Sequence, residues 1–145
     1  MKRLFALALC FLLVFSCMMV ASATTTSADE ANTSPTPTRW SYINNTTTSI
    51  GISGGKAICA GSITGYKGIT TKVEITLTLQ RKLASSSTWD DFYNHPKQIF
   101  NDYCGTASFS KAIVSGYQYR TKAFYTAYSG SSSESLTQYS SVVSY

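Results

Sequence analysis

The sequence is poor in the residues that catalytic and metal-binding chemistry requires. Its 145 residues include one histidine, His95, and seven acidic side chains. A single imidazole makes a poor metal site without partner ligands, and glycoside hydrolysis requires two carboxylates held across a cleft. The H-E-x-x-H motif and phosphate-binding glycine loops are also missing from the sequence. The sequence therefore favours a non-enzymatic protein without catalytic residues, metal or cofactor.

Long apolar runs are confined to the N-terminus. Lys2 and Arg3 precede an uncharged apolar stretch at 4–20, and residues 21–23 form a small-residue cleavage site, Ala-Ser-Ala. This is the pattern of a secretory signal peptide. A membrane anchor is one alternative, and a lipoprotein acylated at Cys17 is another. We interpret residues 1–23 as a signal peptide, which predicts a secreted, extracellular protein that meets the membrane only before cleavage.

Large apolar side chains are missing from residues 24–38, where Thr, Ser and Pro dominate. Such a segment cannot bury enough surface to offset its ordering entropy. We predict a flexible Thr/Ser/Pro-rich spacer at 24–38, followed by one folded domain at 39–145.

Basic residues exceed acidic ones only modestly. Cleavage would remove two of the twelve Lys and Arg and none of the seven acids, so the formal charge falls from +5 to +3. The remaining cations are scattered along the sequence, whereas a nucleic-acid footprint needs a basic stripe. We therefore expect no nucleic-acid partner, although a weak attraction to an anionic cell wall stays open.

Cysteine is scarce, and cleavage would leave only Cys59 and Cys104. An even pair in an exported chain suggests a disulfide, which here would close a loop of about 45 residues. In the chain-entropy model such a bond stabilises by roughly 4 kcal/mol. The alternative is that Cys104 acts as a nucleophile with His95 as its base. The oxidising compartment favours the disulfide.

Helical periodicity is missing, and the spacing of apolar residues is two. In the segment 72–80, Val73, Ile75, Leu77 and Leu79 share one face, and the residues between them are polar. Short strands of this kind, separated by Gly and Ser turns, predict an all-β, immunoglobulin-like antiparallel β-sandwich of about seven strands. Only the segment 90–104 departs from the pattern, and one helical turn is expected near 97–101, after Pro96.

Aromatic residues are concentrated at 116–130, GYQYRTKAFYTAYSG. With the residues before it, this stretch resembles the turn into the sixth strand of fibronectin type III and other immunoglobulin-like domains, where a tyrosine corner pins two strands. The resemblance places Ile113, Gly116 and Tyr119 at the corner and implies that the Tyr119 hydroxyl bonds a nearby backbone group. Alternation then points Tyr119 and Tyr125 into the core, and Phe124 and Tyr128 outward.

Most of the predicted domain, 50–145, also resembles small secreted immunoglobulin-like or fibronectin-III-like domains of Gram-positive bacteria that are recorded only as domains of unknown function. The segments that carry the resemblance are 51–66, 70–82 with a Trp soon after, and 115–130. It implies a sandwich but no activity and no catalytic residues. The chain departs from that pattern at 90–104, which contains Cys104.

Two classes of function remain. The first is a secreted, non-enzymatic interaction or structural module of unknown ligand. The second is a carbohydrate-binding module, and a secreted bacteriocin-like toxin is a weaker third. The expected partner is a cell-wall glycan or a surface protein. The residues proposed to bind it are Trp89, Tyr93, Phe124 and Tyr128. The rings of 89–104 form either a binding loop or a satellite core, and Phe124 and Tyr128 either pack beneath that segment or form an exposed platform.

Overall fold

The structure, a computed structural model, describes residues 40–145, and these fold entirely into strands and turns. The predicted signal peptide (1–23) and spacer (24–38) lie outside the described residues. The strands are β1 (Ile43–Ser53), β2 (Lys56–Gly65), β3 (Lys72–Leu83), β4 (Asp90–Asn94), β5 (Gln98–Phe100), β6 (Cys104–Ala112), β7 (Tyr117–Ser129), β8 (Ser132–Tyr139) and β9 (Val143–Ser144). Within 40–145 there is no helix that could cross a membrane.

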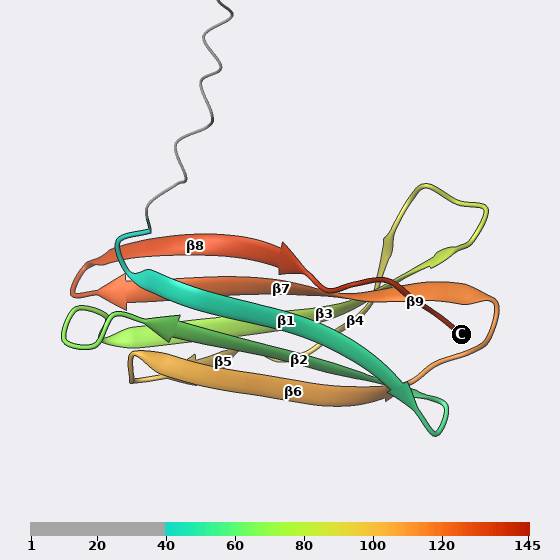
Figure 1. Ribbon diagram of the computed structural model, residues 1–145, viewed down its shortest axis with the longest axis horizontal. Coiled ribbons are helices and arrows are strands. Elements are labelled where there is room, and N and C mark those ends of the chain that lie inside the picture. The colour runs from blue at the N-terminus through green and yellow to red at the C-terminus, as the bar shows by residue number, and fades with distance from the viewer. Residues whose placement is uncertain (1–39) are drawn as a thin grey trace, which may run out of the picture. The chain divides into compact units, whose positions relative to one another are not determined.

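The strands form two antiparallel sheets packed face to face (Figure 1). The smaller sheet has the order β1-β2-β6, and the larger has the order β4-β3-β7-β8. β4 and β5 pair with successive parts of β3, and β8 and β9 pair with successive parts of β7. Nine strands therefore fill seven places in the sandwich, so the predicted all-β class is confirmed. In immunoglobulin constant domains the fourth strand in chain order lies in the same sheet as the first two. Here β4 pairs with β3 in the other sheet, so the sheet that contains β1 and β2 has three strands and the opposite sheet has four places.

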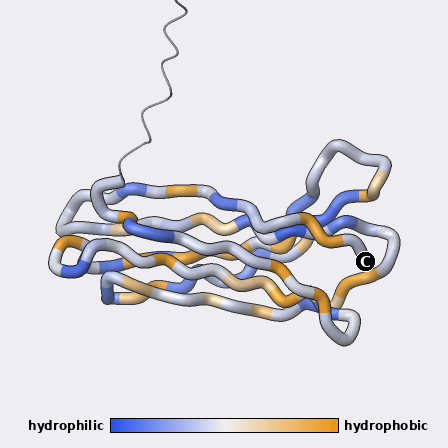
Figure 2. Tube along the Cα trace, in the orientation of Figure 1, coloured by the Kyte–Doolittle hydropathy of each residue, from blue (hydrophilic) through white to orange (hydrophobic). Residues whose placement is uncertain are grey.

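The core lies between the sheets and follows the predicted alternation. β3 and β7 pair without a register shift, from Lys72 opposite Tyr128 to Leu83 opposite Tyr117. Nine residues on the inner side of these two strands are fully buried, as expected: Val73, Ile75, Leu77, Leu79, Tyr119, Thr121, Ala123, Tyr125 and Ala127. In Figure 2 hydrophobic and hydrophilic segments accordingly alternate along the strands.

The predicted tyrosine corner is present at the start of β7. The Tyr119 hydroxyl donates a hydrogen bond to the Val114 carbonyl oxygen at 2.8 Å and accepts one from the Val114 amide at 3.2 Å. Gly116 makes the intervening turn with a φ of 89°, in the left-handed region that favours glycine. One side chain thereby fixes the connection that leads from the smaller sheet to the larger.

The start of β1 is attached to the larger sheet by one carboxylate. Glu134 of β8 accepts hydrogen bonds from the backbone amides of Ser41, Tyr42 and Ile43, at 2.9, 2.5 and 2.5 Å. Bonds to a charged acceptor are stronger than neutral ones. Glu134 therefore fixes the point at which the chain enters the sandwich.

Further along β1, side chains of β7 bind its backbone from the other sheet. The Tyr125 hydroxyl donates to the Thr47 carbonyl oxygen at 2.5 Å, and the Thr121 hydroxyl donates to that of Ser49 at 3.0 Å. Burial raises the pKa of Tyr125, so the phenol stays protonated and can donate. Gly61 makes room for it, because a Cβ there would lie 2.5 Å from the Tyr125 hydroxyl oxygen.

The chain enters and leaves the sandwich at opposite ends (Figure 1). β1 begins beside Glu134, whereas the Tyr145 carbonyl oxygen accepts a bond from the Gly116 amide at the end that carries the β1–β2 turn. That turn consists of Gly54 and Gly55, whose φ angles of 55° and 71° suit a two-residue hairpin.

The segment 90–104 differs from expectation, because the helical turn predicted near 97–101 is wrong. Residues 98–100 form β5, paired with Val73 to Ile75. The edge of β3 left free beyond β4 offers backbone partners to this segment, and pairing with it satisfies more backbone groups than one isolated helical turn could.

The predicted disulfide is also wrong, since Cys59 and Cys104 are both free thiols. In the β2–β6 ladder Cys59 lies opposite Phe109, five residues from Cys104, a separation of about 17 Å along the strand. Cys59 points into the core and Cys104 is exposed, whereas a disulfide requires Cα atoms within about 7 Å. Burial raises the pKa of the Cys59 thiol, although a hydrogen bond with Thr121 opposes that effect.

Replacing Tyr119 with Phe tests the corner. The variant loses both hydroxyl bonds and keeps the ring, so we expect the free energy of unfolding to fall by about 0.5–1.5 kcal/mol in urea titrations. The control is Tyr66→Phe, on an exposed loop tyrosine, which should change stability by less than about 0.5 kcal/mol. Equal effects of the two substitutions would show that the corner bonds contribute nothing.

Replacing Glu134 with Gln tests the attachment of β1. The neutral amide keeps the shape but loses the charge that three backbone amides share, so amide exchange of residues 41–43 should accelerate by about tenfold or more. Exchange in β3 should stay close to that of the parent, because local opening there does not involve Glu134. Unchanged exchange at 41–43 would contradict the assigned role.

Candidate functional site

The solvent side of the larger sheet is the most distinctive surface of the domain. Alternate residues of β3 and β7 are buried in the core, so the remaining residues of each strand point to the solvent side. We call it the outer face. It comprises Lys72, Glu74, Thr76, Thr78, Gln80 and Lys82 of β3, Gln118, Arg120, Lys122, Phe124, Thr126 and Tyr128 of β7, and Ser133, Ser135, Thr137 and Tyr139 of β8. Trp89, Asp91 and Lys97 of the neighbouring segment also belong to it, through their contacts with Arg120, Gln80 and Glu74.

An exposed ring lies in the middle of the outer face. Phe124 is 45% exposed, although its strand is central in the sheet. It borders a shallow hollow of about 360 Å³, whose other walls are Thr76, Thr78, Lys122 and Thr137. The hollow therefore combines one apolar surface with three hydroxyl groups and one ammonium group.

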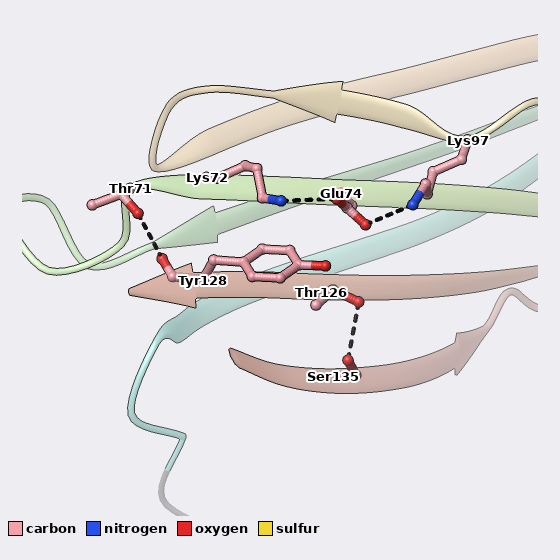
Figure 3. Close-up of polar contacts among 7 residues, drawn as sticks. All are labelled: Thr71, Lys72, Glu74, Lys97, Thr126, Tyr128 and Ser135. Atoms are coloured by element: carbon pink, nitrogen blue, oxygen red, sulfur yellow. Dashed lines mark hydrogen bonds and ion pairs between the residues drawn. The ribbon is translucent and has the colours of Figure 1, made fainter. Parts of the chain in front are cut away.

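A buried carboxylate lies at one end of the face (Figure 3). Glu74 accepts from Lys72 Nζ at 3.1 Å and from Lys97 Nζ at 3.0 Å. Lys72 Nζ also lies 3.7 Å from the centroid of the Tyr128 ring. Desolvation by itself raises the pKa of Glu74, but hydrogen bonds from Lys97, Lys72 and Tyr128 outweigh it, and the pKa is lowered. The hydrogen bond and charge of Glu74 in turn raise the pKa of Lys97.

A stacked cation lies at the other end of the face. The Arg120 guanidinium carbon is 4.2 Å from the ring centroids of both Trp89 and Tyr139. Its Nε donates to Gln80 Oε1 at 2.8 Å, and Gln80 Nε2 donates to Asp91 Oδ1 at 2.6 Å. Cation–π contacts and this short chain of hydrogen bonds hold the Arg120 guanidinium in place.

Three of the four predicted binding residues lie together. Phe124 and Tyr128 lie on the outer face, and Trp89 covers Arg120 there. Tyr93 lies elsewhere: its ring centroid is 5.2 Å from that of Phe109, and Lys111 Nζ is 4.5 Å from its own. The structure thus brings Trp89, Phe124 and Tyr128 onto one surface and separates Tyr93 from them.

The other rings of the segment 89–104 pack inward. Phe92 meets Tyr119 edge-on at 6.4 Å, and His95 stacks on Phe109 at 5.0 Å. Phe100 packs against the core, beside Gly105, where any Cβ would collide with its ring. Phe92 and Phe100 therefore extend the main core and do not form a separate satellite core over Phe124 and Tyr128. The exposed platform is made by β7.

Sequence reasoning missed the gathering of cations on the outer face. Five of the nine Lys and Arg in residues 40–145 lie there, against two carboxylates, Glu74 and Asp91. The five are Lys72, Lys82, Lys97, Arg120 and Lys122. They are scattered in the sequence because β3 and β7 are far apart in it. The available signal was that four of them occupy even-numbered, outward positions of two strands.

A second hollow, of about 460 Å³, lies where the chain enters the domain. Trp40, Ser41, Tyr66 and Ile69 line it, and none of them is charged. It contains fewer groups able to orient a ligand than the hollow beside Phe124 does.

Among residues 40–145 no group of His, Cys, Asp and Glu side chains is placed to hold a metal ion. No protein-family model matches the sequence, and no characterised protein was found to be similar to it. The geometry of the outer face is therefore the feature that points to a function.

Replacing Glu74 with Gln tests the ion pairs. Because the folded pKa of Glu74 lies below its ordinary value of 4.5, the carboxylate stabilises the fold above that pH, and the contribution is lost as the pH falls through the folded pKa. The variant should be less stable than the parent at about pH 7, and the difference should shrink towards about pH 3. Thermal melts across this range measure it.

Asp102→Asn is the matched control, since Asp102 is exposed and forms no ion pair within the described part of the chain. Its difference from the parent should be small at both pH values. A gap between parent and Glu74→Gln that stays constant with pH would contradict the assigned pKa shift.

Proposed function

We propose that the protein is a secreted, non-enzymatic recognition module and that the outer face of its larger sheet is the binding surface. The observation that carries the proposal is the position of Phe124. The ring is 45% exposed on a central strand and borders a hollow with hydroxyl and ammonium groups around it. Binding sites combine an apolar surface with a few placed polar groups in this way.

The surroundings of the reactive side chains support a binding role over a catalytic one. His95 is stacked on Phe109, and the Cys59 thiol is buried with a raised pKa. Glu74 is neutralised by Lys72 and Lys97. General acid–base catalysis needs a group whose pKa lies near the working pH, and the lowered pKa of Glu74 moves that group away from it.

A polyhydroxylated ligand fits the central hollow best, which favours a carbohydrate-binding module among recognition modules. The Phe124 ring can cover the apolar C–H face of a sugar ring, while Thr76 and Thr137 can exchange hydrogen bonds with its hydroxyls. The Thr78 hydroxyl already donates to Asn94 Oδ1. A protein partner would engage the same surface, but its flat, polar character offers no deep pocket for an anchoring side chain.

Replacing Phe124 with Ala tests the proposal, with Ile58→Ala as the control. Both side chains are 45% exposed, but Ile58 lies on the solvent side of the smaller sheet. Retention on insoluble chitin, cellulose and peptidoglycan is measured for the parent and both variants. The parent should be retained by at least one of them, Phe124→Ala should weaken binding about tenfold or more, and Ile58→Ala should not.

Melting temperatures distinguish binding from packing. Phe124→Ala should melt close to the parent, since an exposed ring contributes little to the core. A loss of about 3–5 kcal/mol, as for a buried Phe, would show that the ring is structural and would contradict the proposal. So would equal loss of retention in both variants.

A further inference from the structure

We propose that the ligand of the outer face is an anionic polysaccharide, a chain of sugars that carries carboxylate or phosphate groups at intervals. This inference rests on the proposed function and adds the charge and the extended shape of the ligand. The distribution of cations, their exposed donors and the length of the face support it.

The outer face holds most of the net charge of the domain. Residues 40–145 contain nine Lys and Arg and five Asp and Glu, a formal charge of +4. The outer face has five of those cations and two of the acids, a net charge of +3. A surface of one sign attracts ligands of the other and raises their local concentration.

The cations keep donors free for a ligand. Lys122, with its side chain 35% exposed, lines the hollow beside Phe124, and its nearest carboxylate, Asp91, is 3.9 Å away, beyond a close hydrogen bond. The Lys97 side chain is 52% exposed and uses one bond on Glu74. An ammonium group has three donors, so both lysines can bind an anionic group without giving up their present partners.

Arg120 is positioned for the same purpose. Its guanidinium group makes cation–π contacts with Trp89 and Tyr139, and Gln80 Oε1 accepts a hydrogen bond from its Nε. A guanidinium has five N–H donors in a fixed fork that matches carboxylate and phosphate groups. The terminal nitrogens of Arg120 have no bond to any described residue, and their fixed orientation lowers the entropy cost of binding an anion.

The features lie in a row that suits a polymer. Arg120, Phe124 and Tyr128 are outward positions spaced four residues apart on β7, a step of about 13 Å. Cations lie at both ends of the row: Arg120 at one end, and Lys72 and Lys97 beside Tyr128 at the other. The Phe124 ring lies between the two ends. A ligand that reaches all of them extends over roughly 26 Å, which is the length of an oligosaccharide chain and exceeds any single sugar.

The charge density selects against nucleic acid. Duplex DNA carries one negative charge per about 1.7 Å, and proteins that bind it neutralise many phosphates with unpaired basic residues. Here Lys72 and Lys97 share the carboxylate Glu74, and the net charge of +3 is spread along the whole row. A polymer with widely spaced charges fits this arrangement better.

The experiment compares polygalacturonate with its fully methyl-esterified form, which has the same sugar backbone without the charge. Affinities are measured by calorimetry at about 50 mM and about 500 mM salt. The parent should bind the charged form about tenfold or more tightly at low salt, and the advantage should shrink at high salt. Lys122→Gln should weaken binding of the charged form about three- to fivefold.

Lys56→Gln is the matched control, because it removes the same charge from the smaller sheet. It should leave the affinity unchanged, which separates a local contact from the net charge of the protein.

Equal affinity for the charged and esterified polymers, with loss of both in Phe124→Ala, would overturn this inference and leave the proposed function standing. Tighter binding of a duplex oligonucleotide than of polygalacturonate at the same salt would overturn it in favour of a nucleic-acid ligand. Loss of affinity equal in Lys122→Gln and Lys56→Gln would also overturn it. Failure of Phe124→Ala to affect binding of any polymer would instead count against the proposed function.

Discussion

The uninterrupted register between β3 and β7 is the constraint on which the rest of the structure depends. Twelve consecutive pairs hold the two strands together, so every inner position of one strand meets an inner position of the other. Slipping by one residue would expose the entire core set and bury the charged set. The same register therefore stabilises the hydrophobic core and assembles the outer face, and neither can change position without the other.

Aromatic side chains in this domain have two separate uses. Tyr119 and Tyr125 are buried, and their hydroxyls bind the backbone at places where two strands must stay in contact. On the opposite side of the same strand, Phe124 has solvent around it and Tyr128 lies under a lysine. Strand alternation alone produces this division, because successive residues of β7 face opposite sides of the sheet.

Local pattern was sufficient to predict the core, and a family resemblance predicted the tyrosine corner. The alternation at 72–80 fixes the inner face of β3, and the resemblance of 113–119 to the corner of immunoglobulin-like domains predicted the backbone bond of Tyr119. What the sequence could not supply was pairing between distant segments. The disulfide was predicted from the expected export of the chain and its even number of cysteines. The β2–β6 register instead separates Cys59 from Cys104 and turns them to opposite faces of the sheet. The gathering of cations on the outer face was missed for the same reason, because it arises only when β3 and β7 pair side by side.

The attachment of β1 has a mechanical consequence. Because the chain enters beside Glu134 and leaves at the opposite end of the sandwich, tension between the two ends is directed along the strands (Figure 1). Backbone hydrogen bonds in an antiparallel pair run perpendicular to the strands, so this tension shears the β1–β2 ladder and strains many bonds together. Pulled in this direction, the domain resists extension far better than it would if its strands were peeled apart one bond at a time.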